Sequence, residues 1–253
     1  MKKRLSDIFC VFEIHLARLR AEAGPFLMAA IVFPIGMYLF ASGIAANHQE
    51  AAQNTDKLRF LAASIAFSLS ATAIGWTGYL LLENRFTNRL KLFATLPVAV
   101  SSYVFGILIF ALAQSAIGTT VLLIVAQILG VQPNVGGVSG YLLLAGVILL
   151  SLLSLCGISV IIAARVRSFS AGSLMTDALG AGMILFAPVY YPAETLPAAL
   201  RLVSAILPTT YIARAVNKIL LGDHGIGVEL LILFAMAAVI LSTGFRQMSW
   251  REN

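Results

Sequence analysis

The sequence predicts an all-α membrane protein with six transmembrane helices, an N-terminal interfacial helix, and an outer-leaflet helical hairpin between spans five and six. The first observation behind this prediction is composition, since 60% of the 253 residues are hydrophobic and 11% are charged. Ordinary globular domains are roughly 25% charged, so a soluble core would not absorb this many apolar side chains. The second observation is that apolar residues gather in six segments, and the third is how Lys and Arg are distributed between them. We expect a single membrane domain over residues 1–253.

Residues 1–24 are expected to form an amphipathic helix that lies in the inner membrane interface. Basic residues stand near both ends of this segment, which is typical of interfacial helices. A helix packed on the cytosolic side of the protein is the alternative. The apolar side chains recur at three- and four-residue steps along one helix face, at Leu5, Ile8, Phe9, Phe12, Leu16 and Leu19.

Six apolar segments are long enough to cross a bilayer, which takes about 20 residues in a helix. The fifth segment contains one acidic residue, Asp177, and the sixth contains Glu229 near its start. The expected spans are Pro25–Ala46, Leu61–Leu82, Val98–Gly130, Gly140–Ala164, Ser170–Tyr191 and Ile226–Phe245.

The basic residues predict the orientation of these spans. If the N-terminus is cytoplasmic, 12 of the 17 Lys and Arg residues fall in inner segments and 5 fall in outer segments. Because Lys and Arg are enriched in cytoplasmic loops, we expect both termini to be cytoplasmic.

Residues 83–97, which follow span two, are expected to form a short amphipathic helix that ends before Pro97. Such a helix projects from the membrane and suits a groove on a partner protein. A plain turn that carries orienting charges is the alternative. The charged residues Glu83, Arg85, Arg89 and Lys91 stand ahead of the apolar Leu92 and Phe93.

Residues 192–222 are apolar although they connect two spans, and they predict a helical hairpin on the outer leaflet. Leu196, Leu200 and Val203 share one helical face, and Pro208 ends that helix. A second helix then presents Ile212 and Val216 on an apolar face. Its polar face carries Arg214, Asn217 and Lys218. Two helices satisfy the backbone internally at this depth in the membrane.

Several function classes are excluded by what the sequence lacks. It contains no phosphate-binding loop, no HExxH and no GxSxG, so we expect neither catalytic residues nor a cofactor on this chain. The scattered His15, His48 and His224 lack the spacing of metal ligands. Cys10 and Cys156 should lie far apart, so no disulfide is expected. The net charge of +6 reflects membrane orientation, and nucleic acid is not an expected partner.

Three elements of the chain together resemble the permease subunits of the ABC-2 exporter family. The first is the amphipathic N-terminal helix. The second is NRLKLFATLPV after span two, and the third is YYPAETLPAALRLVSAILPTTYIARAVNKILLG between spans five and six. The resemblance covers nearly the whole chain in order and topology.

The resemblance implies a transporter subunit in the bacterial inner membrane. Two permease copies, either a homodimer or a heterodimer with a paralogue, would each dock on a separate ATPase subunit that binds ATP and Mg²⁺. The helix near residues 85–96 would couple to that ATPase, and spans two and five would line the path. The outer hairpin would act as an exit gate, with Pro197, Val203, Pro208, Ile212, Arg214 and Lys218 as gate candidates.

Candidates for the path lie on spans two and five. Ser64, Ser68, Thr72 and Trp76 repeat every four residues, so they form one mildly polar stripe that faces either the path or another helix. Asp177 is an intramembrane ionisable residue, which by default marks a functional site. The alternatives are that it reaches water on the inner side, about two turns away, or pairs with Arg165 or Arg167.

The few charges along the path favour a hydrophobic or amphipathic cargo, such as a drug, a lipid or a lipid-linked glycan. The alternatives are a secondary transporter, a lipid-modifying membrane enzyme and a non-transport assembly protein.

Overall fold

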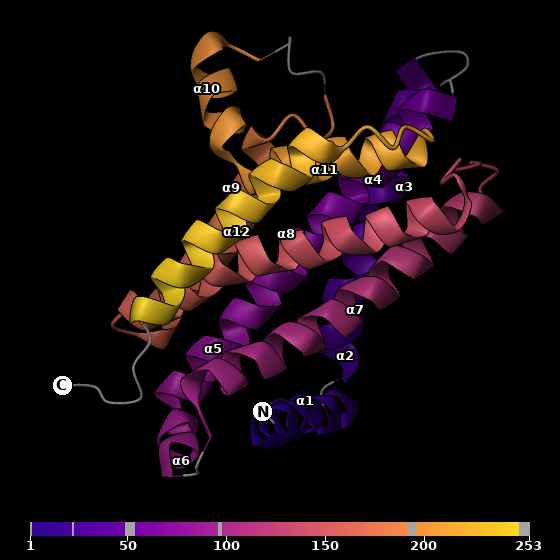
Figure 1. Cartoon of the computed structure of the whole chain (residues 1–253). Coiled ribbons are helices and arrows are strands. Elements are labelled where there is room, and N and C mark those ends of the chain that lie inside the picture. The colour runs from indigo at the N-terminus through magenta and orange to yellow at the C-terminus, as the bar shows by residue number, and fades with distance from the viewer. Residues whose placement is uncertain (1, 22, 49–53, 96–97, 192–195, 248–253) are drawn as a thin grey trace.

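The computed structural model describes residues 2–21, 23–48, 54–95, 98–191 and 196–247, and every regular element in this part of the chain is a helix. Figure 1 shows the helices running side by side as an elongated bundle. The protein is therefore an all-α membrane protein, as its composition predicts.

The N-terminal half contains the predicted interfacial helix and the first two predicted spans. Helix α1 covers Lys2–Ala21. The next segment comprises α2 (Ala23–Leu27), the π-helical η1 (Met28–Val32) and α3 (Phe33–His48). Span two comprises α4 (Asn54–Ser70), the π-helical η2 (Ala71–Trp76) and α5 (Thr77–Phe86), and α6 (Arg89–Thr95) follows it.

The C-terminal half contains two long helices, one shorter span, a bent helix pair and a final span. These are α7 (Val100–Ile128), α8 (Gly137–Arg165), α9 (Phe169–Phe186), α10 (Ala198–Ile206), α11 (Pro208–Leu220) and α12 (Gly227–Gln247).

Five helices in the described part of the chain are long and apolar enough to cross a membrane, and they correspond to predicted spans two to six. Span two is longer than predicted at both ends, covering Thr55–Phe86, whereas α9 ends five residues before the predicted boundary at Tyr191. The predicted first span, Pro25–Ala46, is helical from Ala23 to His48 but is divided by η1. Its apolar helical part, Ala30–Gly43, is shorter than a full span.

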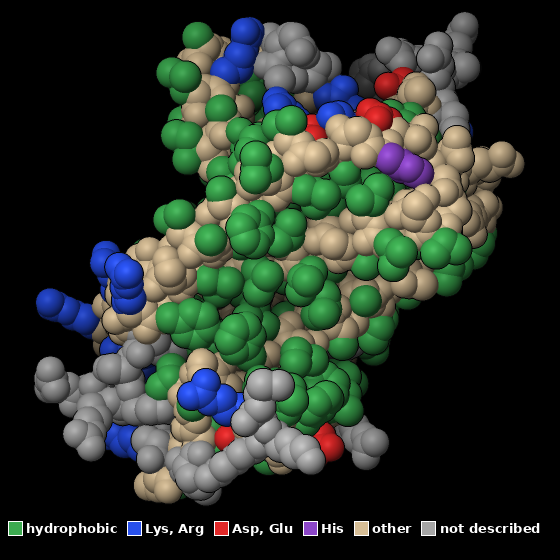
Figure 2. Space-filling model, in the orientation of Figure 1, with side chains coloured by type: hydrophobic (Ala, Val, Ile, Leu, Met, Phe, Trp, Pro, Cys, Tyr) green, Lys and Arg blue, Asp and Glu red, His purple; other side chains and the backbone are tan. Residues whose placement is uncertain are grey.

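The side-chain chemistry of the surface agrees with a membrane-spanning bundle. Figure 2 shows hydrophobic side chains over the middle of one face, with Lys and Arg gathered toward its two ends. Helices α1 and α6 lie toward one end of the bundle, and α10 lies at the other end (Figure 1). The regions predicted to be inside and outside are therefore at opposite ends.

Helix α1 packs across α7 and still leaves apolar side chains at the surface. A Cβ at Gly106 would lie 2.6 Å from Val11, so only glycine permits this close crossing. The rings of Phe12 and His15 lie 6.5 Å and 5.8 Å from that of Phe110. Leu5, Phe9 and Leu16, on one side of α1, are exposed, whereas Leu19 packs against the core. The packing fits the cytosolic alternative, whereas this exposed strip is what the prediction of an interfacial helix requires.

Candidate functional site

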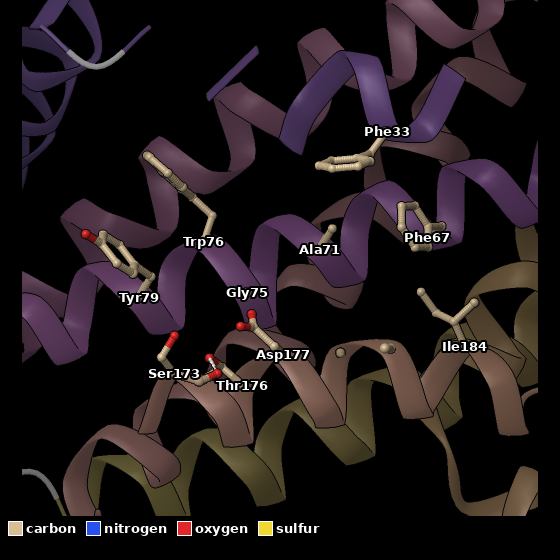
Figure 3. A pocket seen from close by; sticks show the side chains of 12 residues that line it. Phe33, Phe67, Ala71, Gly75, Trp76, Tyr79, Ser173, Thr176, Asp177 and Ile184 are labelled. Carbon is tan, nitrogen blue, oxygen red and sulfur yellow. Dashed lines mark hydrogen bonds between the residues drawn. The ribbon is translucent and has the colours of Figure 1, made fainter. Parts of the chain in front are cut away.

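A cavity of about 550 Å³ opens between span two and span five. Figure 3 shows its walls, to which α3 contributes Phe33. The span-two wall consists of Phe67, Ala71, Gly75, Trp76 and Tyr79. The span-five wall consists of Ser173, Thr176, Asp177, Gly180, Ala181 and Ile184.

The space exists because small residues stand where the two spans face each other. Ala71 and Gly75 lie opposite Gly180 and Ala181 in the cavity walls, and a Cβ at Gly75 would meet no atom within 4 Å. The walls on the span-two side are otherwise aromatic. Both Gly75 and Trp76 belong to η2, and π-helical turns inside α-helices are frequent at functional sites.

Asp177 is the one charged side chain among the lining residues. Its carboxylate extends across the cavity toward Gly75 (Figure 3). Within the described residues it takes part in no hydrogen bond or ion pair, and Arg165 instead donates to Gln247 Oε1 at 2.8 Å. The expected alternative pairing of Asp177 with Arg165 or Arg167 is thus not seen here.

The polar stripe on span two is mostly turned away from the cavity. Ser64, Ser68 and Thr72 are buried, and only Trp76 of the four lines the cavity. Ser64 donates to the Phe60 carbonyl at 2.9 Å, and Ser68 Oγ lies 3.1 Å from a Cβ built at Gly118 of α7. This position favours helix–helix contact, and a role for these three residues in the path stays a prediction.

A second set of polar side chains is buried on α7, the helix that Ser68 contacts. Gln114, Ser115 and Thr119 are at most 2% exposed. Glycine at position 118 between them allows the close contact with Ser68 and with the Ala30 carbonyl. The Gln114 amide, expected to hydrogen-bond between helices, makes no hydrogen bond to a described residue.

Sequence reasoning missed the stripe of span two that faces the cavity. Phe67, Ala71, Gly75 and Tyr79 lie one helical position away from the polar stripe and carry no charge or amide. It also missed Ser70, whose hydroxyl donates to the Gly180 carbonyl at 3.3 Å and links span two to span five. No sequence signal distinguishes these residues from lipid-facing ones.

The region predicted as one coupling helix, residues 83–97, is divided in the structure. Glu83 and Arg85 belong to the last turns of α5, and α6 starts at Arg89 after a turn. Asn88 adopts φ 61° at this turn, which asparagine tolerates better than most residues. Residues 96–97, at the predicted end, lie outside the described residues.

The six coupling candidates have different surroundings. Arg85 donates to the carbonyls of Ala163 and Val166, so it binds the C-terminal end of α8. Glu83 forms an ion pair with Arg89 at 3.4 Å. The Phe93 ring lies 5.0 Å from the Tyr103 ring of α7, whereas Leu92 is 66% exposed and Lys91 is also exposed.

The segment predicted as an outer hairpin contains two helices, α10 and α11, but they bend by 81° and so do not lie antiparallel as in a hairpin. Pro197 precedes α10, and Pro208 is the first residue of α11, where its missing N–H costs nothing. Residues 192–195 lie outside the described residues. The two helices differ in packing, because α11 contacts α4, α8 and α12 while α10 projects from the bundle (Figure 1). Ile212 is fully buried, and Val203 is 43% exposed.

Three successive residues at the bend donate to the ends of the two preceding helices, and one of them, Thr209, joins the bend to span five. Thr209 Oγ1 donates to the Met183 carbonyl of α9 at 2.7 Å. Thr210 Oγ1 donates to the Ser204 carbonyl at 2.6 Å, and the Tyr211 hydroxyl donates to the Ala205 carbonyl at 2.8 Å. These carbonyls lie in the last turns of α9 and α10, where helix carbonyls lack intrahelical partners.

The two basic gate candidates also differ. Arg214 is exposed, and its guanidinium lies 5.9 Å from the Tyr211 ring centroid. Lys218 forms an ion pair with Glu229 of α12 at 2.8 Å. Lys218 therefore holds α11 against α12, while Arg214 stands on the surface.

Comparison with known proteins gave one match. The family model described as ABC-2 type transporter matches residues 4–221, which include most of α1, spans one to five and both helices of the bend. No match was found among curated proteins.

Proposed function

The chain belongs to the ABC-2 type transporter family and is a membrane permease of an ABC transporter, and from this premise we propose that it exports a hydrophobic or amphipathic cargo. The cargo would leave the cytoplasm or the inner leaflet. The observation that carries the proposal is the cavity between spans two and five. The cavity is largely apolar, and one of its walls is α9, to which Thr209 of the bend is hydrogen-bonded.

Energy would come from ATP and Mg²⁺ bound by a separate ATPase subunit, the partner that the family implies. Helix α6 is the docking element in this proposal, since Lys91 and Leu92 are exposed at one end of the bundle. Phe93 anchors the same helix on Tyr103 of α7. A movement of the ATPase would thereby be transmitted to spans two and three.

A second permease copy would complete the path. Only 22% of the apolar window of α9 is buried within the chain, compared with 72% for span two. Leu174, Met175, Leu179, Leu185 and Phe186 leave an apolar surface on α9 beside the cavity. A homodimer, or a heterodimer with a paralogue, would cover this surface and close the cavity against lipid.

The bend would act as the exit gate. Its α10 arm is exposed and apolar, with Leu202 and Ile206 each more than 70% exposed. Through Thr209 the bend is bonded to α9, which forms one wall of the cavity. A change in the position of span five would therefore shift the hairpin, and an apolar arm seals a lipid-facing exit where a polar loop would admit water.

Filling the cavity tests this proposal. Gly75→Phe places a ring in the open space that the glycine leaves, without a clash at its Cβ. The complex with its ATPase, reconstituted in proteoliposomes, should lose ATP-driven movement of a lipophilic dye while it still assembles. Gly146→Phe is the matched control, because its Cβ also meets no atom within 4 Å but it lies on α8, outside the cavity. Wild-type transport by a correctly assembled Gly75→Phe variant would show that the cavity is not the path.

A further inference from the structure

The cavity contains one negative charge and no positive one among its lining residues. Asp177 supplies that charge, and the remaining wall is aromatic, aliphatic or hydroxyl-bearing. Resting on the proposed transport function, we propose that this cavity binds an amphipathic cation, with the cationic group at Asp177 and the apolar body among the aromatic rings.

The depth of Asp177 in the membrane is the first argument. It is the ninth residue of the 18-residue helix α9, so it lies near the middle of the span. An ionised carboxylate there costs several kcal/mol unless it is paired or hydrated, and such residues almost always mark a ligand or ion pathway. Asp177 is exposed to the cavity and no described basic residue pairs with it, so its carboxylate is accessible to a cationic ligand that would offset this cost.

Three basic residues toward the predicted cytoplasmic end of the bundle have other partners. Arg85 donates to the α8 carbonyls, Arg89 pairs with Glu83, and Arg165 donates to Gln247. None of them lines the cavity. Asp177 is therefore the charged group nearest to a ligand in the cavity, and its field favours cations over anions of the same size.

The aromatic walls provide the second recognition element. Trp76 and Tyr79 stack with their ring centroids 6.0 Å apart, and Phe33 and Phe67 face the same space. Aromatic faces attract cations by about 0.5–2 kcal/mol each and also bury apolar ligand surface. The volume of about 550 Å³ lies within the range of pockets that hold drug-sized molecules.

The test compares a lipophilic cation with uncharged and anionic probes of similar shape. Binding of radiolabelled tetraphenylphosphonium, triphenylphosphine oxide and tetraphenylborate is measured on the complete transporter complex in lipid nanodiscs. Wild type should bind the cation most tightly. Asp177→Asn, which keeps the shape and removes the charge, should weaken binding of the cation by about tenfold or more. It should leave binding of triphenylphosphine oxide unchanged.

Two further variants separate a charge effect from a folding effect. Asp177→Glu keeps the carboxylate and should keep cation preference, and Asp223→Asn removes an exposed acid distant in sequence and outside the cavity lining, so binding should not change. Equal binding of the cation by wild type and Asp177→Asn would overturn the inference, and so would a wild-type preference for the neutral or anionic probe.

The same variants, reconstituted in proteoliposomes for uptake and in nanodiscs for binding, distinguish this inference from the transport proposal. ATP-driven uptake of triphenylphosphine oxide without Asp177-dependent cation binding would leave export standing and reject cation recognition. Asp177-dependent cation binding without ATP-driven movement of any probe would establish the binding site and reject export.

Discussion

At the scale of single residues, Ile212 and Val203 show how similar sequence patterns lead to different environments. Both residues stand on apolar helix faces within the outer hairpin. Ile212 has no exposed surface, because α11 packs against α4, α8 and α12, whereas Val203 on α10 is 43% exposed. The same substitution should therefore affect folding at one position and only the local surface at the other.

We expect Ile212→Asp to prevent accumulation of folded protein, since an unpaired charge buried among helices destabilises by more than about 3 kcal/mol. Val203→Asp should accumulate near the wild-type level, because an acidic side chain near the membrane interface costs much less than one at the centre. Yield of monodisperse protein in detergent and its midpoint of thermal unfolding measure the difference. Ile212→Val serves as the conservative control. Equal yields of the two Asp variants would contradict the buried position of α11.

The two basic residues of α11 also lie in different environments although the sequence places them alike. Lys218 is bound to Glu229 across the contact with α12, and Arg214 lies on the surface beside Tyr211. The sequence places both on one polar face. Their different partners depend on which neighbouring helix each side chain reaches, so only Arg214 remains available at the surface.

At the scale of elements, α6 combines an anchoring side chain with an exposed one. Phe93 packs on Tyr103, whose hydroxyl accepts a hydrogen bond from Asn84 of α5 at 2.8 Å. This set of contacts fixes α6 against spans two and three. Leu92, the preceding residue, points outward and is 66% exposed.

Leu92→Ser should weaken binding of the ATPase subunit without changing thermal stability, since it removes an exposed apolar contact only. Phe93→Ser should lower thermal stability, because it leaves a gap beside Tyr103 and exposes α6 to displacement. Co-purification of the ATPase, combined with a thermal unfolding midpoint for the permease alone, separates the two effects. If Leu92→Ser retains the ATPase as well as wild type does, α6 does not dock through this side chain.

The π-helical segments are elements that the sequence did not predict. Segment η2 supplies part of the cavity wall, and η1 packs against it. Both lie within apolar runs of ordinary composition. A π turn depends on local insertion of one residue relative to α-helical spacing, and packing of neighbouring helices decides whether that insertion is retained.

At the scale of the whole molecule, the distribution of charge predicts how the bundle lies in the membrane. The predicted inner and outer regions are at opposite ends of the bundle (Figure 1). Asp223 in the connection before α12 and Lys91 on α6 are both exposed. A label at each position therefore tests which side of the membrane that end of the bundle faces. Gln53, in the first predicted outer loop, lies outside the described residues.

A cysteine at position 223 should react with a membrane-impermeant maleimide on intact cells, and one at position 91 should react only after permeabilisation. The substitutions are Asp223→Cys and Lys91→Cys in a background with Cys10→Ser and Cys156→Ala. Twelve of 17 basic residues on the inner side are the reason for this orientation. The reverse labelling pattern would place both termini outside.

Composition and length were enough to predict spans two to six and the class of protein. An apolar run of about 20 residues must cross or enter the bilayer whatever its neighbours are, so spans two to six follow from composition and length. Pro208 marks the start of α11 for an equally local reason, because proline cannot continue a helix. The motifs around it were sufficient to indicate the family.

Which helix faces meet depends on how the helices pack in three dimensions. Span two is apolar on most sides, so its sequence does not distinguish the stripe at Ala71 and Gly75, which lines the cavity, from the stripe at Ser68 and Thr72, which is buried toward its neighbours. In a membrane, water does not select the polar side of a helix, and close packing and hydrogen bonds between helices decide its rotation instead. For the same reason, the sequence did not predict the burial of α11 or the contact of Ser70 with Gly180. Nor did it predict that Asp177 faces the cavity with no ion-pair partner among the described residues.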